Sequence, residues 1–307
     1  MAITLQESLR GLFYAPFYAA LARDAYAQEG VDVRFVSAPR PGDAATNILG
    51  GTADVCWGGP MRVMQTYHQV PGCDLVSFAE VVTRDPFVLV GRTPNPGFKM
   101  ADLIGPRLGS VSEVPTPWLC LQEDIRRAGL DPATVTRHAT GTMAENAAAL
   151  GRGDLDVIQV FEPFVSSLLA SGVGHIWYAA ASRGPTSYTT FYARRGILAE
   201  RHDELRRMVR GIARTQGWVA GASAAEIAQT IAPTFFPDTP LPLLTTAIER
   251  YKTLGIWSAS PVMPRVGYDR LLAGLVSGGF VSPGTPFEVA VDNSIAAEVE
   301  AELRSAG

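Results

Sequence analysis

The stretch ITLQESLRGLFYAPFYAALARDAYAQEGVDVRFV, residues 3–36, decides the fold because it joins two strand patterns through one helical pattern. The apolar run at residues 3–5 predicts a first strand, and residues 31–36 alternate apolar and polar side chains as a second strand does. Between them, residues 17–28 carry a helical pattern that ends at Gly30, a residue suited to close a helix. A strand, a helix and a strand in this order predict a parallel β–α–β unit.

The alternation continues along the chain and predicts an α/β protein with mostly parallel sheets covered by helices. Further strands are predicted at 53–57, 75–81, 87–91, 108–111, 135–138, 157–161, 176–179 and 188–193. Helices are predicted at 43–49 with Asp43 as N-cap, after Gly59 to about residue 69, at 118–127 and at 143–150. Longer helices are predicted at 199–219, 224–231, 241–254 and 268–276.

The alternation of strand and helix patterns begins again after Arg84, which predicts two lobes. Lobe one would hold residues 1–86 and 187–307, including the C-terminal helices, and lobe two would hold residues 87–186. Two crossing strands, at 87–91 and 188–193, would form the hinge between them. Ligands of such folds bind at the carboxyl ends of the strands, so we expect a cleft between the lobes that closes by a hinge motion.

Composition excludes several classes of function. The 307 residues carry a net charge of -4, whereas a nucleic-acid partner would require a basic surface. No apolar run approaches the roughly 20 residues of a membrane helix, so no membrane insertion is expected. Three widely spaced cysteines and four histidines show no metal-ligand spacing, and no catalytic motif occurs. We therefore expect no metal, no cofactor and no catalytic residue.

Two loops follow strands and precede helices, which makes them candidates for the edge of the cleft. The first holds Gly11, Phe13 and Tyr14, whose rings can stack on a flat ligand or pack against the next helix. The second is Gly58-Gly59-Pro60, where glycines let the backbone approach a ligand and the helix start offers free N–H groups. A plain tight turn is the alternative for this second loop.

Several landmarks resemble one family in the same order along residues 3–220. They are Ala15-Pro16-Phe17-Tyr18, Gln28 to Val33, Gly50 to Val55, Arg84 to Val90, Ala101 to Gly109, Gly153-Asp154-Leu155-Asp156 and Phe161-Glu162-Pro163-Phe164. The family is that of substrate-binding proteins of ABC importers, in the branch of alkanesulfonate binders, thiamine-pyrimidine-precursor binders and thiamine-pyrimidine synthases. The resemblance implies a two-lobed type II periplasmic-binding-protein-like fold, a small-molecule ligand, and a permease and ATPase complex as partners.

Further residues are expected at the cleft, the first of them from the resemblance. In sulfonate binders the turn corresponding to Ser112 to Thr116 presents N–H groups and hydroxyls to the anion, and Trp118 would line the pocket or belong to the core. Glu162 would accept from a ligand amino group, or serve as a helix-start carboxylate. Arg84 would pair with a ligand anion or tie the domains together. Trp57 and Tyr188 complete the predicted site.

The expected ligand has a flat or apolar body and an anionic or strongly polar group, as in sulfonates, aromatic carboxylates or amino-pyrimidines. Glu7 and Glu113 would favour a cationic ligand instead if their carboxylates faced inward. The synthases' lysine, histidine and cysteine-rich motif have no counterpart in residues 57–62 and 188–195, which favours transport. A cytoplasmic enzyme on the same fold, for pyrimidine synthesis, desulfination or decarboxylation, is the alternative.

The sequence is compatible with two cellular locations. Met1 and Ala2 lead directly into the first strand pattern without a secretory leader. An importer component would be periplasmic or otherwise outside the cytoplasm, with a leader missing from this chain, whereas an enzyme would be cytoplasmic.

Overall fold

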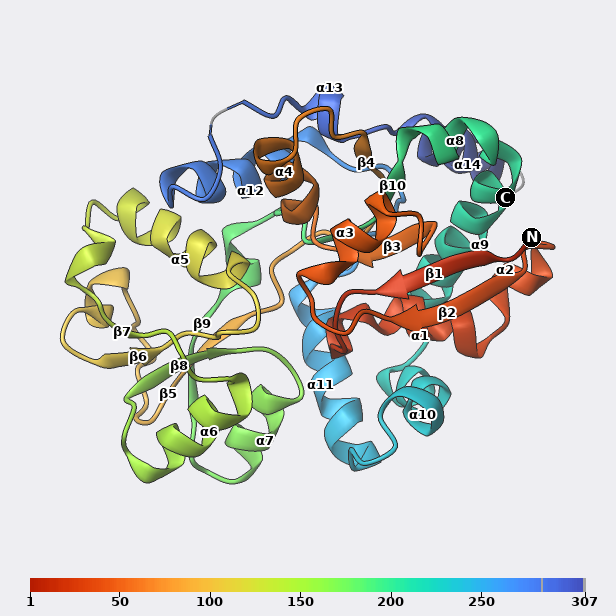
Figure 1. Ribbon diagram of the computed structural model, residues 1–307. Coiled ribbons are helices and arrows are strands. Elements are labelled where there is room, and N and C mark those ends of the chain that lie inside the picture. Colours follow the sequence, from red (N-terminus) through yellow and green to blue (C-terminus); the bar gives the residue numbers. More distant parts are fainter. Residues whose placement is uncertain (283, 306–307) are drawn as a thin grey trace.

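The computed structural model describes residues 1–282 and 284–305, and its strands form two separate five-stranded sheets (Figure 1). The first sheet has the order β2-β1-β3-β10-β4, in which β10 runs antiparallel to both of its neighbours. Its strands are β1 (Ile3–Glu7), β2 (Val33–Ser37), β3 (Val55–Gly58), β4 (Leu75–Val82) and β10 (Thr189–Arg194).

The second sheet has the order β7-β6-β8-β5-β9, and β5 runs antiparallel to β8 and β9. Its strands are β5 (Val88–Gly91), β6 (Arg107–Gly109), β7 (Thr136–His138), β8 (Val157–Val160) and β9 (His175–Ala179). Each sheet therefore contains one antiparallel strand among parallel ones, so the prediction of mostly parallel sheets holds best for β1, β2 and β3 and for β6, β7 and β8.

Helices cover both faces of the first sheet. Phe191 and Tyr192 are neighbours on β10, yet Phe191 belongs to the core under α1 and α9, while Tyr192 belongs to the core under α4 and α12. The helices are α1 (Ala15–Ala22), α2 (Ala25–Gln28), α3 (Asp43–Leu49), α4 (Met61–Gln69), α5 (Thr116–Arg127), α6 (Met143–Arg152), α7 (Phe164–Ala170), α8 (Arg195–Glu200), α9 (His202–Gly221), α10 (Ala224–Phe235), α11 (Leu241–Leu254), α12 (Arg265–Ser277), α13 (Phe287–Ala290) and α14 (Ser294–Ser305). Short 3-10 turns lie at η1 (Leu12–Tyr14), η2 (Met100–Leu103), η3 (Pro132–Thr134) and η4 (Ala180–Arg183).

Two local predictions need correction. The single helix predicted over residues 17–28 is broken into α1 and α2, because Asp24 adopts a left-handed conformation with φ of 55°. Asp43 is the first residue of α3 and not its N-cap, which is Gly42. An aspartate in the first turn still interacts favourably with the helix dipole, so its place at the helix start is physically reasonable.

The chain builds the first sheet through β4, then the second sheet, and returns to the first with β10 (Figure 1). We keep the names lobe one for residues 1–86 and 187–307 and lobe two for residues 87–186. The predicted hinge strands do not pair with each other, because β5 lies inside the second sheet and β10 inside the first. The irregular connections around them meet instead, where the Thr186 N–H donates to the Thr83 carbonyl at 2.8 Å.

Two helices of lobe one contact lobe two beyond these connections. α12 packs against α5, where a Cβ added to Gly274 would lie 3.4 Å from the Cys120 backbone, and α11 packs against α7 (Figure 1). Among the described residues, none of the helices combines the length and the apolar character required to cross a membrane.

Candidate functional site

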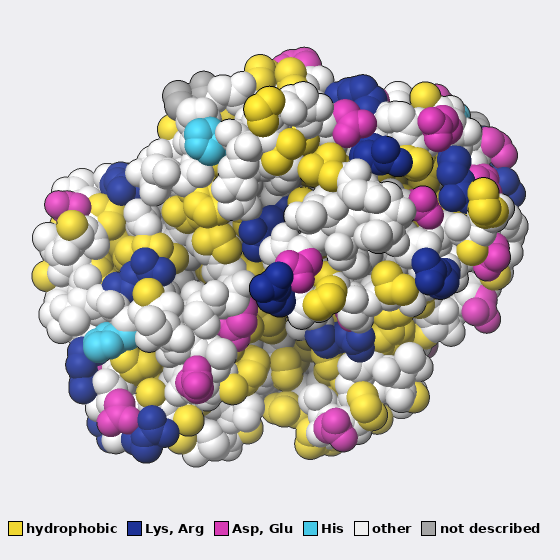
Figure 2. Space-filling model, in the orientation of Figure 1, with side chains coloured by type: hydrophobic (Ala, Val, Ile, Leu, Met, Phe, Trp, Pro, Cys, Tyr) yellow, Lys and Arg dark blue, Asp and Glu magenta, His cyan; other side chains and the backbone are white. Residues whose placement is uncertain are grey.

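A cavity of about 40 Å³ lies between the two lobes, where the loops after several strands meet. Its residues come from the loops after β1, β2, β6 and β8, from the turn after β3, from the starts of α4 and α5, and from the two connections between the lobes. They are Ser8, Leu9, Phe13, Tyr14, Pro41, Gly59, Met61, Arg62, Phe87, Val114, Thr116, Phe161 and Tyr188. Figure 2 shows Lys or Arg side chains at the border between the two bodies. The cavity therefore lies at the carboxyl ends of strands, as this type of fold predicts.

Arg62 brings a positive charge to the cavity without an acidic partner. It is the second residue of α4, and its Nη1 donates to Oε1 of Gln65 at 2.8 Å. No carboxylate in residues 1–282 and 284–305 forms an ion pair with it, and burial lowers the pKa of the guanidinium from its ordinary value. A partly buried cation that lacks a counter-charge is stabilised when an anion lies beside it.

Hydroxyl groups and helix starts add donors around the same cavity. The hydroxyls of Ser8 and Tyr14 lie 3.2 Å apart, and burial raises the pKa of Tyr14, so its phenol stays protonated and able to donate. Met61 begins α4 and Thr116 begins α5, and both residues line the cavity. Two helix N-termini, one from each lobe, therefore direct the positive ends of their dipoles toward it.

The carboxylates near the cleft are engaged elsewhere. Glu7 accepts from Arg10 at 2.6 Å, from the Tyr18 hydroxyl at 2.9 Å and from the Ser37 hydroxyl at 2.6 Å. Oε1 of Glu113 accepts from the Met143 N–H at 2.9 Å, at the start of α6. Neither glutamate lines the cavity, although Oε2 of Glu113 is buried with no hydrogen-bond partner among the described residues.

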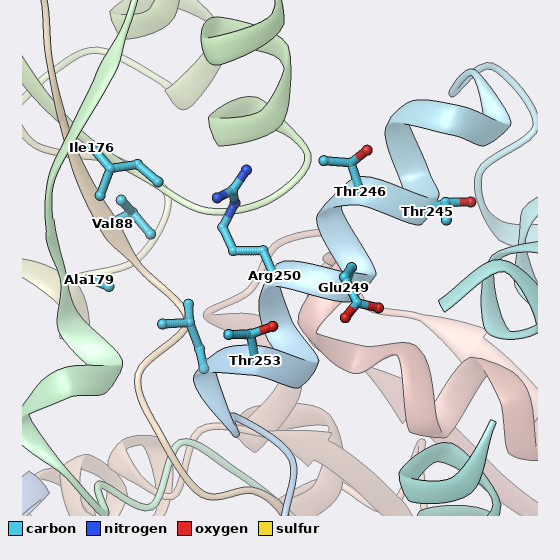
Figure 3. A pocket seen from close by; sticks show the side chains of 9 residues that line it. Val88, Ile176, Ala179, Thr245, Thr246, Glu249, Arg250 and Thr253 are labelled. Atoms are coloured by element: carbon cyan, nitrogen blue, oxygen red, sulfur yellow. The ribbon is translucent and has the colours of Figure 1, made fainter. Parts of the chain in front are cut away.

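A larger hollow of about 590 Å³ lies between α11 and the strands β5 and β9 (Figure 3). Val88 and Ile176 form its lobe-two wall, while Arg250 extends from α11 toward lobe two and pairs with Glu162 at 2.7 Å. Because this arginine already has a carboxylate partner, the described residues that line the hollow include no unpaired cation to hold an anion. We therefore place the candidate site in the smaller cavity at the strand ends.

Comparison with known proteins identifies the family. A family model described as NMT1/THI5 like matches residues 13–222, which is more than half of the chain. This chain belongs to the NMT1/THI5-like family. The resemblance predicted from the ordered landmarks is therefore confirmed at the level of the family.

Individual relatives of this NMT1/THI5-like protein agree on the fold. The "Putative binding protein YtlA" of Bacillus subtilis (strain 168) is 26% identical, over 98% of this chain and 90% of the relative. The periplasmic sulfonate-binding protein SsuA of Methylobacillus flagellatus KT has a TM-score of 0.79 at 15% identity, covering 100% of this chain and 96% of that one. The periplasmic nitrate-binding protein NrtA of Synechocystis PCC 6803 has a TM-score of 0.73 at 15% identity, covering 98% and 88%. The predicted periplasmic-binding-protein fold is confirmed.

The structure brings five of the predicted site residues of this NMT1/THI5-like chain to the cavity and leaves eight outside its lining. Those that line it are Phe13, Tyr14, Gly59, Thr116 and Tyr188. Those that do not are Gly11, Trp57, Gly58, Pro60, Arg84, Ser112, Trp118 and Glu162.

Three of the eight lie next to lining residues in the same loops. A Cβ on Gly11 would lie 2.6 Å from Cε1 of Phe13, so this glycine leaves room for that ring. A Cβ on Gly58 would lie 3.1 Å from the Tyr192 ring and 3.3 Å from the Ser8 hydroxyl, so Gly58 permits their close packing. Pro60 is the N-cap residue of α4.

Two tryptophans belong to the core, which was the alternative for Trp118. Trp57 is fully buried and stacks between Phe17 and Phe35, with ring centroids at 4.7 and 5.2 Å. Trp118 packs in the core of lobe two, with the Arg137 guanidinium 4.5 Å from its ring centroid. Neither ring is available to a ligand in this arrangement.

The other three have different surroundings. Ser112 is exposed, and Arg84 lies beside Gly255 with no ion pair in the part of the chain that the structure describes. Glu162 is completely buried, and its oxygens accept from the Ser166 N–H and hydroxyl and from Arg250. Its role as a helix-start carboxylate, the alternative to ligand contact, is the one that the structure shows, and we remove Glu162 from the site.

Sequence reasoning missed Arg62, Ser8, Phe87 and Phe161. Arg62 lies two residues beyond the Gly59-Pro60 turn, so the expectation of a helix start at the cleft already contained the signal. The first turn of the predicted helix includes Arg62. Phe87 and Phe161 carried no such signal, because a phenylalanine next to a strand is most often a core residue.

The two buried cysteines do not supply a reactive thiolate. Cys56 and Cys120 are buried, and burial raises the pKa of each thiol to about 12. Thiolate is the nucleophilic form, so both groups are inert near neutral pH. This weakens the alternative of an enzyme that uses Cys56 or Cys120 as a nucleophile.

Proposed function

We propose that this protein captures a small organic anion between its lobes and delivers it to an ABC importer. The observation that carries the proposal is Arg62, a partly buried cation at the cavity with no carboxylate partner in the described chain. The starts of α4 and α5 and the Tyr14 phenol supply further donors. Aromatic side chains around the same cavity offer contact to an apolar ligand body.

Of the ligands expected from the sequence, sulfonates and aromatic carboxylates fit the proposal better than amino-pyrimidines. The residue expected to accept from a pyrimidine amino group was Glu162, and its oxygens are already paired. The relatives support transport by their names, since one is called a binding protein and another a periplasmic sulfonate-binding protein. We accordingly propose a permease and ATPase complex as partners and a location outside the cytoplasm.

Titration calorimetry tests the ligand class, with ethanesulfonate, benzoate, an amino-pyrimidine and a quaternary ammonium ion as probes. We expect the anions to bind and Arg62→Gln to weaken them about tenfold or more, since a charge-assisted hydrogen bond contributes about 1.5–3 kcal/mol. Arg152→Gln, at an exposed arginine of α6 paired with Asp154, is the matched control and should bind normally. Tightest binding of the cation, or equal affinity in Arg62→Gln, would contradict the proposal.

Delivery to an importer needs a test in cells. Deleting the gene should abolish uptake of the radiolabelled anion that calorimetry identifies, and complementation with the Arg62→Gln variant should restore it poorly. Unchanged uptake in the deletion strain would argue against a transport role.

A further inference from the structure

Tyr14 and four further aromatic side chains line the cavity, and these four come from both lobes and both connections. Phe13 belongs to the loop after β1, Phe87 directly precedes β5, Phe161 follows β8 and Tyr188 directly precedes β10. The ring of Phe161 meets those of Phe13 and Phe87 edge to face, with centroids 5.2 Å apart in each case. Tyr188 lies 6.0 Å from Phe13 and 6.4 Å from Phe87.

The ring on the lobe-one side is held in place by its own lobe. Phe13 contacts the Tyr14 ring at 4.2 Å, and its carbonyl accepts from Nε1 of Trp257 at 2.8 Å. The absence of a side chain at Gly11 leaves the ring the space that it occupies. Phe13 therefore forms a fixed wall of the cavity.

The ring on the lobe-two side is held through the residue that follows it. The N–H of Glu162 donates to the Tyr251 hydroxyl at 2.9 Å, and Nε of Arg250 donates to the Glu162 carboxylate at 2.7 Å. Both partners belong to α11 of lobe one, and Figure 3 shows Arg250 reaching across from that helix. Glu162 is thus anchored to the opposite lobe, and Phe161 has little freedom to retreat when the lobes are closed.

From this geometry we infer that Phe161 sets the largest apolar body that the closed cleft accepts. The inference rests on the proposed function, because it concerns the body of the same organic anion whose charged end Arg62 would hold. A longer body must push the Phe161 ring against Phe13 and Phe87, and overpacking of this kind is costly. Phe161 is therefore a specificity-determining residue that selects short or compact organic anions.

Calorimetry with linear alkanesulfonates and alkanecarboxylates of two to eight carbons tests this role. The wild-type protein should prefer short chains, and Phe161→Ala should raise the ratio of long-chain to short-chain affinity. We expect a change of about tenfold or more, because fitted pockets discriminate single methylene groups by about 10–200-fold. Phe161→Leu should shift the ratio in the same direction by less, and Phe161→Trp should shift it toward shorter chains.

The leucine and tryptophan variants keep the inference testable if the alanine variant does not fold. Phe98→Ala removes a lobe-two ring that packs on Trp177 and Tyr178, away from the cavity, and should leave the chain-length preference unchanged. Binding of anions with the same preference in wild type and all Phe161 variants would overturn the inference but not the proposed function. Binding of no anion to the wild-type protein would overturn the proposed function, and the inference with it.

Discussion

Glu80 is a buried carboxylate on β4 that forms no ion pair with any of the residues that the structure describes. It is fully buried, and neither of its oxygens has a well-formed hydrogen bond among the described residues, although the side chains of Ser187 and Thr83 lie beside it. Burial raises the pKa of this carboxyl from its ordinary 4.5 to about 7. The folded protein therefore holds a proton on Glu80 in a pH range where the unfolded chain has released it.

Glu80→Gln should therefore raise the free energy of unfolding, and it should do so more at high pH than at low pH. As the pH rises from about 4.5 to about 7, this group lowers the free energy of unfolding, and above pH 7 the loss stays constant at about 3 kcal/mol. The variant should match wild type near pH 4.5 and unfold at higher denaturant concentration at pH 8. Urea unfolding at both pH values measures this, with Glu249→Gln at an exposed glutamate as control. Equal pH dependence of Glu80→Gln and wild type would contradict the assignment.

At the scale of single residues, position after a strand was the useful signal in the sequence. Phe13, Tyr14 and Gly59 were predicted because they follow strand patterns, and Thr116 because its turn resembles that of sulfonate binders. All four line the cavity, whereas Gly11, Gly58 and Pro60 of the same predicted loops do not. Trp57 was misplaced because it lies within β3, where the side chain direction depends on the packing of Phe17 and Phe35 on either side. Those partners are distant in sequence, so no local pattern identifies them.

At the scale of elements, helix α9 contains one glycine that packs closely against a neighbouring helix and another that faces open space. Gly211 faces α2, and a Cβ there would lie 2.9 Å from the Ala25 carbonyl oxygen. Gly217 lies on the same helix with nothing within 4 Å of the corresponding position. The contact is with backbone, which cannot rotate aside as the end of a side chain can.

These two glycines provide a matched pair of alanine substitutions. Gly217→Ala should stabilise the protein by about 0.5–1 kcal/mol through the higher helix propensity of alanine. Gly211→Ala gains the same propensity but must displace α2, and overpacking costs about 1–3 kcal/mol, so we expect a net loss. Urea unfolding measures both, and stabilisation of similar size in the two variants would show that α2 moves away freely.

Element type was easier to predict than element boundaries. The alternation of strand and helix patterns is local, so the strand and helix order was largely predictable through β10. The break between α1 and α2 was not, because it depends on one left-handed residue, Asp24. The order of strands within the sheets was not predictable either, since the insertion of β10 between β3 and β4 depends on contacts more than 100 residues apart in sequence.

For the whole molecule, a buried ion cluster joins the two connections to lobe two. Arg183 pairs with Asp85 at 2.6 Å and with Asp124 of α5 at 2.5 Å, and Arg270 of α12 donates to the Arg183 carbonyl. Asp85 precedes β5 and Arg183 follows β9, so one guanidinium holds both connections against lobe two. We therefore expect hinge rotation to occur on the lobe-one side of this cluster, near Thr83 and Gly184.

We infer from the size of the cavity that the lobes lie closer together here than when a ligand enters. Ligand pockets commonly enclose about 300–1,000 Å³, far more than the 40 Å³ found here, so the lobes must part to admit a ligand. The pair of Arg250 and Glu162 crosses between the lobes, and the carboxylate is completely buried. In an open form Glu162 would reach water, so the pair stabilises the closed form specifically.

Arg250→Gln should accordingly shift the lobes toward the open form. The substitution leaves a buried carboxylate without its cation in the closed form, a cost that opening relieves through hydration. Affinity for the anion should fall about tenfold, in proportion to the loss of closed molecules. Small-angle scattering should show a larger radius of gyration without ligand and the wild-type value at saturation. Glu249→Gln, its exposed neighbour on α11, should behave as wild type in both measurements. If Arg250→Gln also matched wild type in radius and affinity, other contacts would have to hold the lobes closed, with the Phe13 and Phe161 rings as the first to examine.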